Sequence, residues 1–236
     1  MKLSVVVPAY NEERLLAQTL EPIRGGMQAA ARRGWAVELI VCDNNSTDRT
    51  AQIAHAAGAR VVFEPVNQIA RARNTGAAHA SGDWLLFVDA DSRPGAALFD
   101  QMLDVMEKAV CVGGGATIAL PGAPPFVRAW VGAWNALSRA MKWAAGSFLF
   151  CRADVFRALG GFSHELYAAE EIDLSRRLKR MGRVVILHRH PLHTSDRKVH
   201  LYTWGEHLAF LWRMLSGGRR TLRSRDACSV WYDGRR

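Results

Sequence analysis

Two acidic residues directly after an apolar run are the best-placed residues of this chain for chemistry. Asp89 and Asp91 follow the run 85–88, with Ala90 between them. Alternate residues of an extended strand point the same way, so both carboxylates can meet one ion or one ligand. Carboxylates at the end of a buried strand suit a hard divalent cation that carries a phosphorylated ligand. This pattern predicts a site for a nucleotide diphosphate with its metal ion.

An Asp-x-Asp pair alone is weak evidence, because a strand followed by a polar turn looks the same. Three further short runs have the β-branched composition of buried strands: residues 3–7, 37–42 and 60–64. Helical segments separate these runs, which predicts a mostly parallel, doubly wound α/β sheet. In such sheets ligands bind at the carboxyl ends of the strands. Asp43, Asp89 and Asp91 all fall at those ends.

Six segments taken together resemble the inverting family 2 glycosyltransferases, whose nucleotide-sugar-binding fold is called GT-A. They are residues 5–12, 43–48, 74–76 with Gly82, 87–91, 160–162 and 170–174. The resemblance implies an α/β fold of the GT-A type, with a mostly parallel sheet and helices on both faces. It also implies single-displacement transfer of a sugar from a nucleotide-diphosphate sugar to an acceptor hydroxyl. The implied cofactor is a divalent cation, Mn²⁺ or Mg²⁺, and a UDP-sugar is expected over a GDP-sugar.

The resemblance places the catalytic base in an acidic pair at a helix start. An inverting transfer needs one general base and no covalent nucleophile. The family's base corresponds here to Glu171. Because this chain has Glu-Glu where the family usually has Glu-Asp, Glu170 remains a second candidate. The alternative is that both glutamates only favour the helix amino terminus.

The resemblance also implies a donor-binding set. It consists of Pro8, Ala9, Tyr10, Glu12, Asp43, Arg71, Arg73, Asp89 and Ala90. Asp43 would accept a hydrogen bond from the base or ribose, and Tyr10 could lie alongside the base. Asp91 corresponds to the family's direct metal ligand. Arg71, or as second choice Arg73, would balance the donor's negative charge, although either could face outward. Glu12 is expected to organise hydrogen bonds, and Asp48 to cap a helix.

A later segment supplies further candidates. His193 is the candidate second metal ligand, and Arg197 or Lys198 the candidate diphosphate contact. A surface or core histidine and solvated charges are the competing interpretations. Gly160, Gly161 and Phe162 resemble a turn that lines the acceptor pocket.

Length and composition favour one domain. The resemblance implies a catalytic domain over 1–198, with a nucleotide-sugar half at 1–115 and an acceptor half at 116–198. Residues 199–236 are expected to be an amphipathic, basic extension. The four scattered cysteines do not form a zinc or disulfide pattern, which fits a reducing compartment. Neither a leader peptide nor a long uncharged run is recognisable. We therefore expect a cytoplasmic protein, and peripheral attachment at the inner membrane face stays open.

Positive charge is concentrated in the last quarter of the chain, where residues 176–236 hold 15 Lys and Arg against 4 Asp and Glu. Such charge could meet a diphosphate, anionic lipid or nucleic acid, and nucleic acid is not expected. The acceptor is expected to be a sugar, a lipid-linked molecule or a small molecule. Two other functions stay open: a non-enzymatic basic binding module and a nucleotidyltransferase on a similar fold.

One aromatic stripe in the middle of the chain has two interpretations. Trp130, Trp134, Leu137 and Met141 recur at helical spacing after the breaker segment 121–125. A helix packed on the sheet is preferred over an interfacial helix at a membrane.

Overall fold

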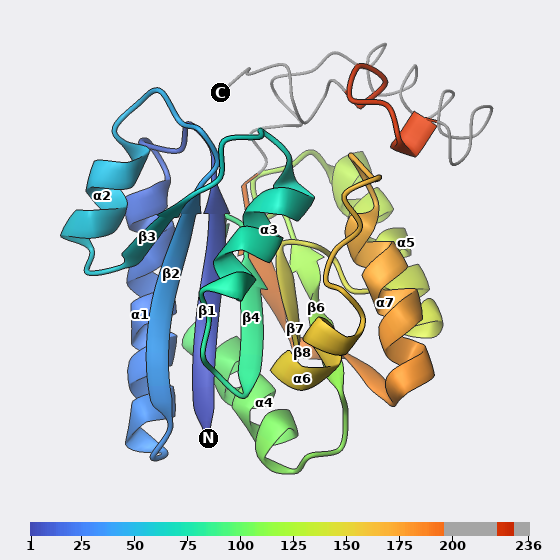
Figure 1. The fold of residues 1–236 in the computed structure, drawn as a ribbon. Coiled ribbons are helices and arrows are strands. Elements are labelled where there is room, and N and C mark those ends of the chain that lie inside the picture. Colours follow the sequence, from blue (N-terminus) through green and yellow to red (C-terminus); the bar gives the residue numbers. More distant parts are fainter. Residues whose placement is uncertain (196–220, 229–236) are drawn as a thin grey trace.

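One mixed sheet organises the computed structural model, which describes residues 1–195 and 221–228 (Figure 1). Its strands are β1 (Lys2–Ala9), β2 (Ala36–Asp43), β3 (Arg60–Phe63), β4 (Trp84–Val88), β5 (Ser92–Arg93), β6 (Gly113–Ala119), β7 (Phe148–Arg152) and β8 (Val184–Thr194). The strand order is β3-β2-β1-β4-β7-β6-β8-β5. Strands β1 to β4 are parallel, β7 runs antiparallel to both of its neighbours, and β5 runs antiparallel to β8.

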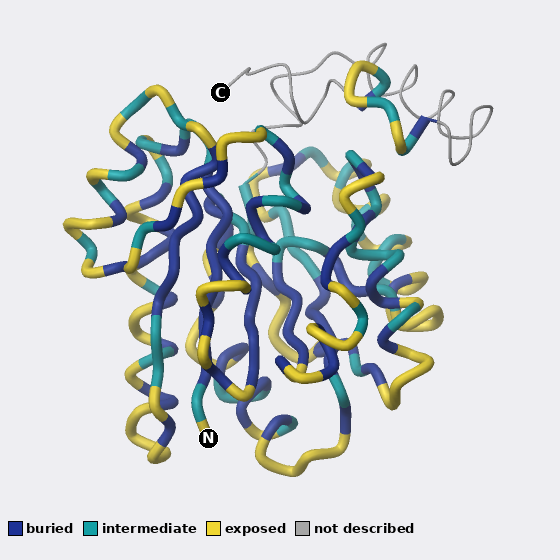
Figure 2. The backbone as a smooth tube through the Cα atoms, in the orientation of Figure 1, coloured by how far each residue is buried: buried dark blue, intermediate teal, exposed yellow. Residues whose placement is uncertain are grey.

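Helices cover both faces of this sheet (Figure 1). They are α1 (Leu16–Arg32), α2 (Thr50–Ala56), α3 (Ile69–Ala78), α4 (Ala96–Glu107), α5 (Pro125–Met141), α6 (Ala153–Ala158) and α7 (Glu170–Met181). Alternation along β1 divides the core: Val5 and Val7 pack with α1 and α4, and Val6 packs with α3 and α7. The strands are accordingly buried along most of their length (Figure 2). The expected α/β class with a mostly parallel sheet is confirmed.

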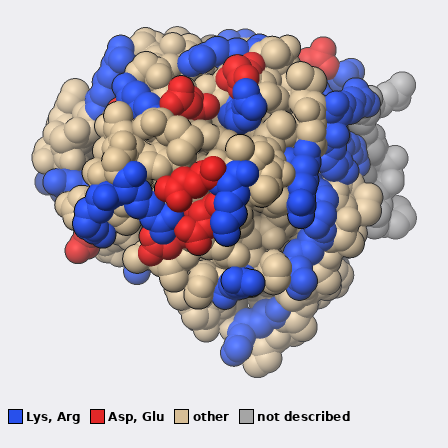
Figure 3. Space-filling model, turned by 90° about the horizontal axis from the view of Figure 1, so that it is seen from below, with Lys and Arg blue, Asp and Glu red and all other residues tan. Residues whose placement is uncertain are grey.

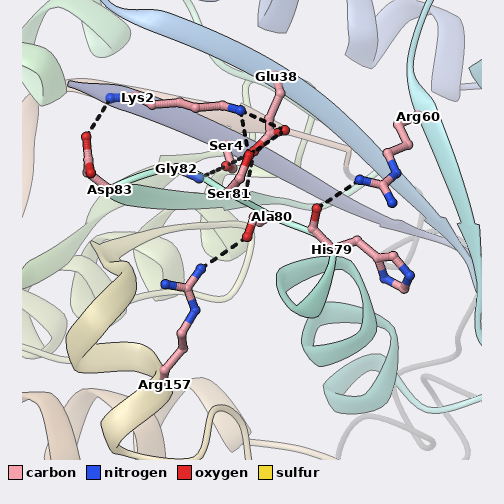
Figure 4. Close-up of polar contacts among 10 residues, drawn as sticks. All are labelled: Lys2, Ser4, Glu38, Arg60, His79, Ala80, Ser81, Gly82, Asp83 and Arg157. Atoms are coloured by element: carbon pink, nitrogen blue, oxygen red, sulfur yellow. Dashed lines mark hydrogen bonds and ion pairs between the residues drawn. The ribbon is translucent and has the colours of Figure 1, made fainter.

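The α3–β4 connection is tied to the amino-terminal ends of β1 and β2, on the side away from the acidic strand ends (Figure 4). The Lys2 backbone N–H donates to Asp83 Oδ2 at 2.8 Å, and the Gly82 N–H donates to Ser4 Oγ at 2.8 Å. A Cβ at Gly82 would lie 2.8 Å from the Ser4 nitrogen, so only glycine allows this approach. These contacts fix the register of β4 and therefore the position of Asp89 beyond its other end.

One expectation about a helix needs correction. Helix α5 does form, but its apolar stripe does not pack on the sheet: Trp130, Leu137 and Met141 are exposed, and Trp134 is only half-buried. The buried residue of α5 is Ser138. Helical spacing shows that apolar residues share a face, but it does not show which way that face turns.

Candidate active site

Two loops at the carboxyl ends of β1 and β2 are joined by hydrogen bonds. Ala9 and Asp43 are neighbours in the parallel register of these strands. The Asn11 N–H donates to Ser46 Oγ at 3.0 Å, and the Thr47 N–H donates to Asn11 Oδ1 at 2.8 Å. Asn11 has a left-handed φ of 52°, which asparagine tolerates better than most residues. The loop pair is therefore a preorganised wall beside the strand ends.

Several predicted donor-binding residues lie in this wall, and most have buried side chains. Pro8, Ala9 and Glu12 are buried, and Tyr10 is half-buried. Asp43 is buried as well, and its Oδ1 accepts the Ser46 N–H at 3.0 Å. If Pro8 and Ala9 contact the nucleotide-sugar donor, they would therefore do so through backbone atoms.

Glu12 and Asp48 lie at the starts of α1 and α2. The backbone carbonyl of Glu12 accepts the Leu16 N–H at 2.9 Å. The Asp48 side chain accepts the Glu13 N–H at 3.0 Å and the N–H of Thr50, the first residue of α2, at 2.9 Å.

Arg73 joins the two acidic regions of the chain. Its side chain rises from α3 and is 1% exposed. Nη1 donates to Glu170 Oε1 at 2.6 Å, and Nη2 donates to Asp89 Oδ1 at 2.8 Å. Nη2 also reaches the Gly146 carbonyl at 3.1 Å. Burial opposes the charge, but Asp89 and Glu170 outweigh it and hold the pKa of Arg73 above its usual value. A buried cation with two carboxylate partners fixes β4 and α7 relative to each other.

This geometry corrects one expectation. Arg73 does not face outward, because its guanidinium is buried between Asp89 and Glu170. Glu170 is itself buried and bound to Arg73. Sequence reasoning missed this bridge. The available signal was an arginine surrounded by small residues, since Ala72, Gly76 and Ala77 mark the buried face of α3.

Glu171 is more exposed than Glu170, the residue before it. It begins α7 with Glu170, after Ala169 in a left-handed conformation with φ 61°. Its side chain keeps part of its surface exposed. Burial and then the charge of Glu170 raise the pKa of Glu171 to about 8, although Arg73 acts in the opposite direction. A carboxyl group that holds its proton near neutral pH has the pKa that a general base requires.

Asp91 and His193 lie on one small pocket. Its volume is about 280 Å³, and its lining includes Asp91, Arg93, His193 and Thr19. Arg93 and His193 are register partners in the β5–β8 ladder, and the Ser195 N–H donates to the Asp91 carbonyl at 3.2 Å. The end of β8 therefore brings His193 close to Asp91, so that the two predicted metal ligands lie on the same pocket.

The donor set of this pocket fits a divalent cation only in part. A carboxylate and an imidazole are both acceptable to Mn²⁺. Within residues 1–195 and 221–228, no three His, Cys, Asp or Glu side chains gather as a metal site. Other ligands of such an ion would have to be oxygens of a bound diphosphate or water.

The expected acceptor turn is mainly a packing element. Gly160 and Gly161 both have φ +72°, and the Phe162 N–H donates to Asn74 Oδ1 at 2.9 Å. The Phe162 ring is 2% exposed and lies 5.2 Å from the Arg73 guanidinium carbon. The Phe162 side chain therefore packs against Arg73, and any contact of this turn with an acceptor would involve other atoms than this buried ring.

The remaining candidates lie at the edges of the site. Ala90 is buried, and its carbonyl accepts the Thr19 hydroxyl at 2.7 Å. Arg71 is half-buried on α3. Arg197 and Lys198 lie outside the described residues.

A family model described as "Glycosyl transferase family 2" matches residues 4–142. The chain belongs to this family. The match covers the loops at the ends of β1 and β2, Arg73, and the acids after β4. Among similar proteins, the probable glycosyltransferase YdaM of Bacillus subtilis is 28% identical over 204 residues, which cover 77% of this chain and 47% of YdaM. The chain thus spans about half the length of this relative.

Solved structures agree on the fold. S. aureus TarS 1-349 in complex with UDP-GlcNAc aligns with a TM-score of 0.66 at 16% identity, covering 99% of this chain and 71% of that one. The mannosyltransferase PcManGT from Pyrobaculum calidifontis, in complex with GDP-Man and Mn²⁺, aligns with a TM-score of 0.67 at 19% identity, covering 96% and 64%. At these identities the matches confirm the GT-A fold of this family 2 chain, and they do not extend to its substrates.

Proposed function

We propose that this protein is a metal-dependent inverting glycosyltransferase. In this reaction Glu171 removes the proton from an acceptor hydroxyl, whose oxygen attacks the anomeric carbon of a nucleotide-diphosphate sugar. The bond to the diphosphate breaks, and the nucleotide diphosphate leaves from the opposite face of the sugar. Asp43 and the backbone around Tyr10 hold the nucleoside, and Asp89 contacts the ribose or sugar.

The observation that carries the proposal is the buried bridge from Asp89 through Arg73 to Glu170. It holds the acid at the tip of β4 and the acid pair at the start of α7 in one network. A donor bound against β4 and an acceptor activated from α7 would then be held in fixed relative positions. A binding module or a nucleotidyltransferase gives no reason for this bridge, which supports transfer over both alternatives.

Asp91 and His193 are the proposed metal ligands. When bound, the cation would neutralise charge that develops on the leaving diphosphate. Asp91 supplies the hard oxygen that Mn²⁺ and Mg²⁺ both accept. His193 supplies an imidazole nitrogen, which favours Mn²⁺.

The donor is proposed to be a UDP-sugar, with a GDP-sugar as the alternative, because the two structural neighbours carry UDP-GlcNAc and GDP-Man. The acceptor is a sugar, a lipid-linked molecule or a small molecule. Residues 1–198 are proposed to form the catalytic domain. No helix among the described residues is long and apolar enough to cross a membrane. A cytoplasmic location is part of the proposal.

A donor-hydrolysis assay tests the function directly. UDP-, GDP- and TDP-sugars are incubated with the protein, with and without Mn²⁺. We expect metal-dependent release of nucleotide from one of the UDP-sugars. Release of pyrophosphate from a nucleoside triphosphate in the presence of a sugar phosphate would instead support a nucleotidyltransferase. Activity that is unchanged in EDTA would contradict the metal requirement.

The pH profile offers a prediction about the base itself. A base with a raised pKa is protonated below it, so kcat/KM should fall as the pH drops below about 8. Glu170→Gln keeps an acceptor for Arg73 but removes the like charge that raises the pKa of Glu171. The acid limb of the profile should therefore move to lower pH. The control is Glu21→Gln on the exposed side of α1, which should leave the limb in place. An acid limb that Glu170→Gln does not move would contradict the proposed coupling.

A further inference from the structure

Helix α5 turns its large apolar side chains toward solvent. Phe126, Trp130, Leu137 and Met141 are 44%, 68%, 45% and 41% exposed. Their spacing of four, seven and four residues places them on one stripe of the helix. Figure 2 shows α5 mostly in the colours of exposed and intermediate residues, in contrast to the buried strands beside it. A contiguous apolar stripe of this size on a surface marks an interaction site.

The inner side of α5 is held to the sheet by polar contacts. Asn135 Nδ2 donates to the Ile118 carbonyl at 2.8 Å, and the Ile118 N–H donates to Asn135 Oδ1 at 3.0 Å. Ser138 Oγ donates to the Trp143 carbonyl at 2.6 Å, a local bond at the end of the helix. The Asn135 bonds to β6 fix the rotation of the helix about its axis. The outward direction of the stripe is therefore built into the fold.

Basic side chains of α7 meet the end of this stripe. Lys179 Nζ donates to the Met141 carbonyl at 2.9 Å, and the Arg176 guanidinium carbon lies 4.9 Å from the Trp143 ring centre. Lys142 and Arg180 are exposed beside them. Figure 1 shows α5 and α7 on the same side of the molecule, and Lys and Arg gather along that side in Figure 3. An apolar stripe beside exposed cations complements a surface with an apolar interior and anionic headgroups.

We propose that the stripe of α5 and the neighbouring cations of α7 bind the surface of an anionic phospholipid bilayer. The aromatic residues enter the boundary between headgroups and acyl chains, and Lys142, Lys179 and Arg180 contact the headgroup phosphates. This helix lies on the membrane and does not cross it, because it has 17 residues and carries the charges of Arg128 and Arg139. The inference goes beyond the proposed activity, and its test does not use that activity.

Vesicle co-sedimentation tests the proposal with the full chain. Wild-type protein should sediment with vesicles that contain phosphatidylglycerol at low salt, and less at high salt, because salt screens the headgroup charge. It should sediment weakly with pure phosphatidylcholine. Trp130→Ser removes the most exposed aromatic ring and should lower the partition coefficient about tenfold. Replacing Lys179 and Arg180 by Gln should lower binding only to the anionic vesicles.

The matched control is Phe63→Ser. Phe63 is 59% exposed at the end of β3, at the other edge of the sheet, and should have no effect on binding. If Trp130→Ser binds as wild type does, or if Phe63→Ser loses as much, the assignment to α5 is overturned. Sedimentation velocity in solution tests the main alternative, in which a second copy of this chain covers the stripe of α5. A wild-type dimer that Trp130→Ser dissociates would show that a second copy covers the stripe, which would also overturn the proposal.

Discussion

Glu171→Gln is expected to lower the rate of sugar transfer by about 10²-fold or more, the usual contribution of a positioned general base. Affinity for the nucleotide sugar should stay close to that of wild type, because the proposed donor contacts lie at the ends of β1, β2 and β4 and do not include Glu171. Glu170→Gln should lose less, since Glu170 acts through Arg73. The measurement is the single-turnover rate together with donor binding by calorimetry. A larger loss for Glu170→Gln would move the base to Glu170.

The unfolding temperature of Glu171→Gln serves as the folding control, and it is expected to stay equal to or rise above that of wild type. A carboxyl group with a pKa raised from 4.5 to about 8 is disfavoured in its charged form by the folded state. Its contribution to stability therefore decreases as the pH rises through this window. Glu171→Gln removes that cost, so its unfolding temperature should equal or exceed that of wild type, and the gain should grow from about pH 5 to about pH 8. A strongly lowered unfolding temperature would mean that lost activity reflects lost structure.

Asp91→Asn is expected to abolish nearly all turnover and to weaken donor binding in the presence of Mn²⁺. A neutral amide is a poor ligand for a hard cation. The fold should survive, because the carbonyl of residue 91 still accepts the Ser195 N–H, and a side-chain oxygen remains for the Ser92 hydroxyl, which lies 3.5 Å from Asp91 Oδ1. The measurement is a Mn²⁺ titration of donor hydrolysis, in which the half-activating concentration should rise steeply.

Asp104→Asn is the matched control for this change. Asp104 is an exposed carboxylate on α4, paired with Arg33 away from the strand ends. It should leave the metal titration unchanged. Nucleotide affinity measured in EDTA should be equal for Asp91→Asn and wild type, since the residue is assigned to the metal alone. Wild-type activity of Asp91→Asn at limiting Mn²⁺ would refute that assignment.

The sequence by itself determined the fold class and the edge of the sheet that carries the acids. Apolar runs ending at Asp43 and Asp89 define parallel strands, and parallel strands deliver their carboxyl ends to one edge. This information is local, since it depends only on which residues follow each strand. The contact of Asp48 with the start of α2 was predictable for the same reason.

Tertiary structure alone decided the roles of Arg73, Phe162 and α5. Arg73 and Glu170 are 97 residues apart in the chain, and the pairing depends on how α3 and α7 meet on one face of the sheet. Spacing along a helix fixes which residues share a face, but the direction of that face follows from contacts with distant segments. In α5 those contacts are the hydrogen bonds of Asn135 to β6. They place the polar side of the helix on the sheet, so the apolar stripe faces solvent although its residues are hydrophobic. Long-range pairing of polar groups, absent from any local pattern, decided the active-site bridge and this exposed surface.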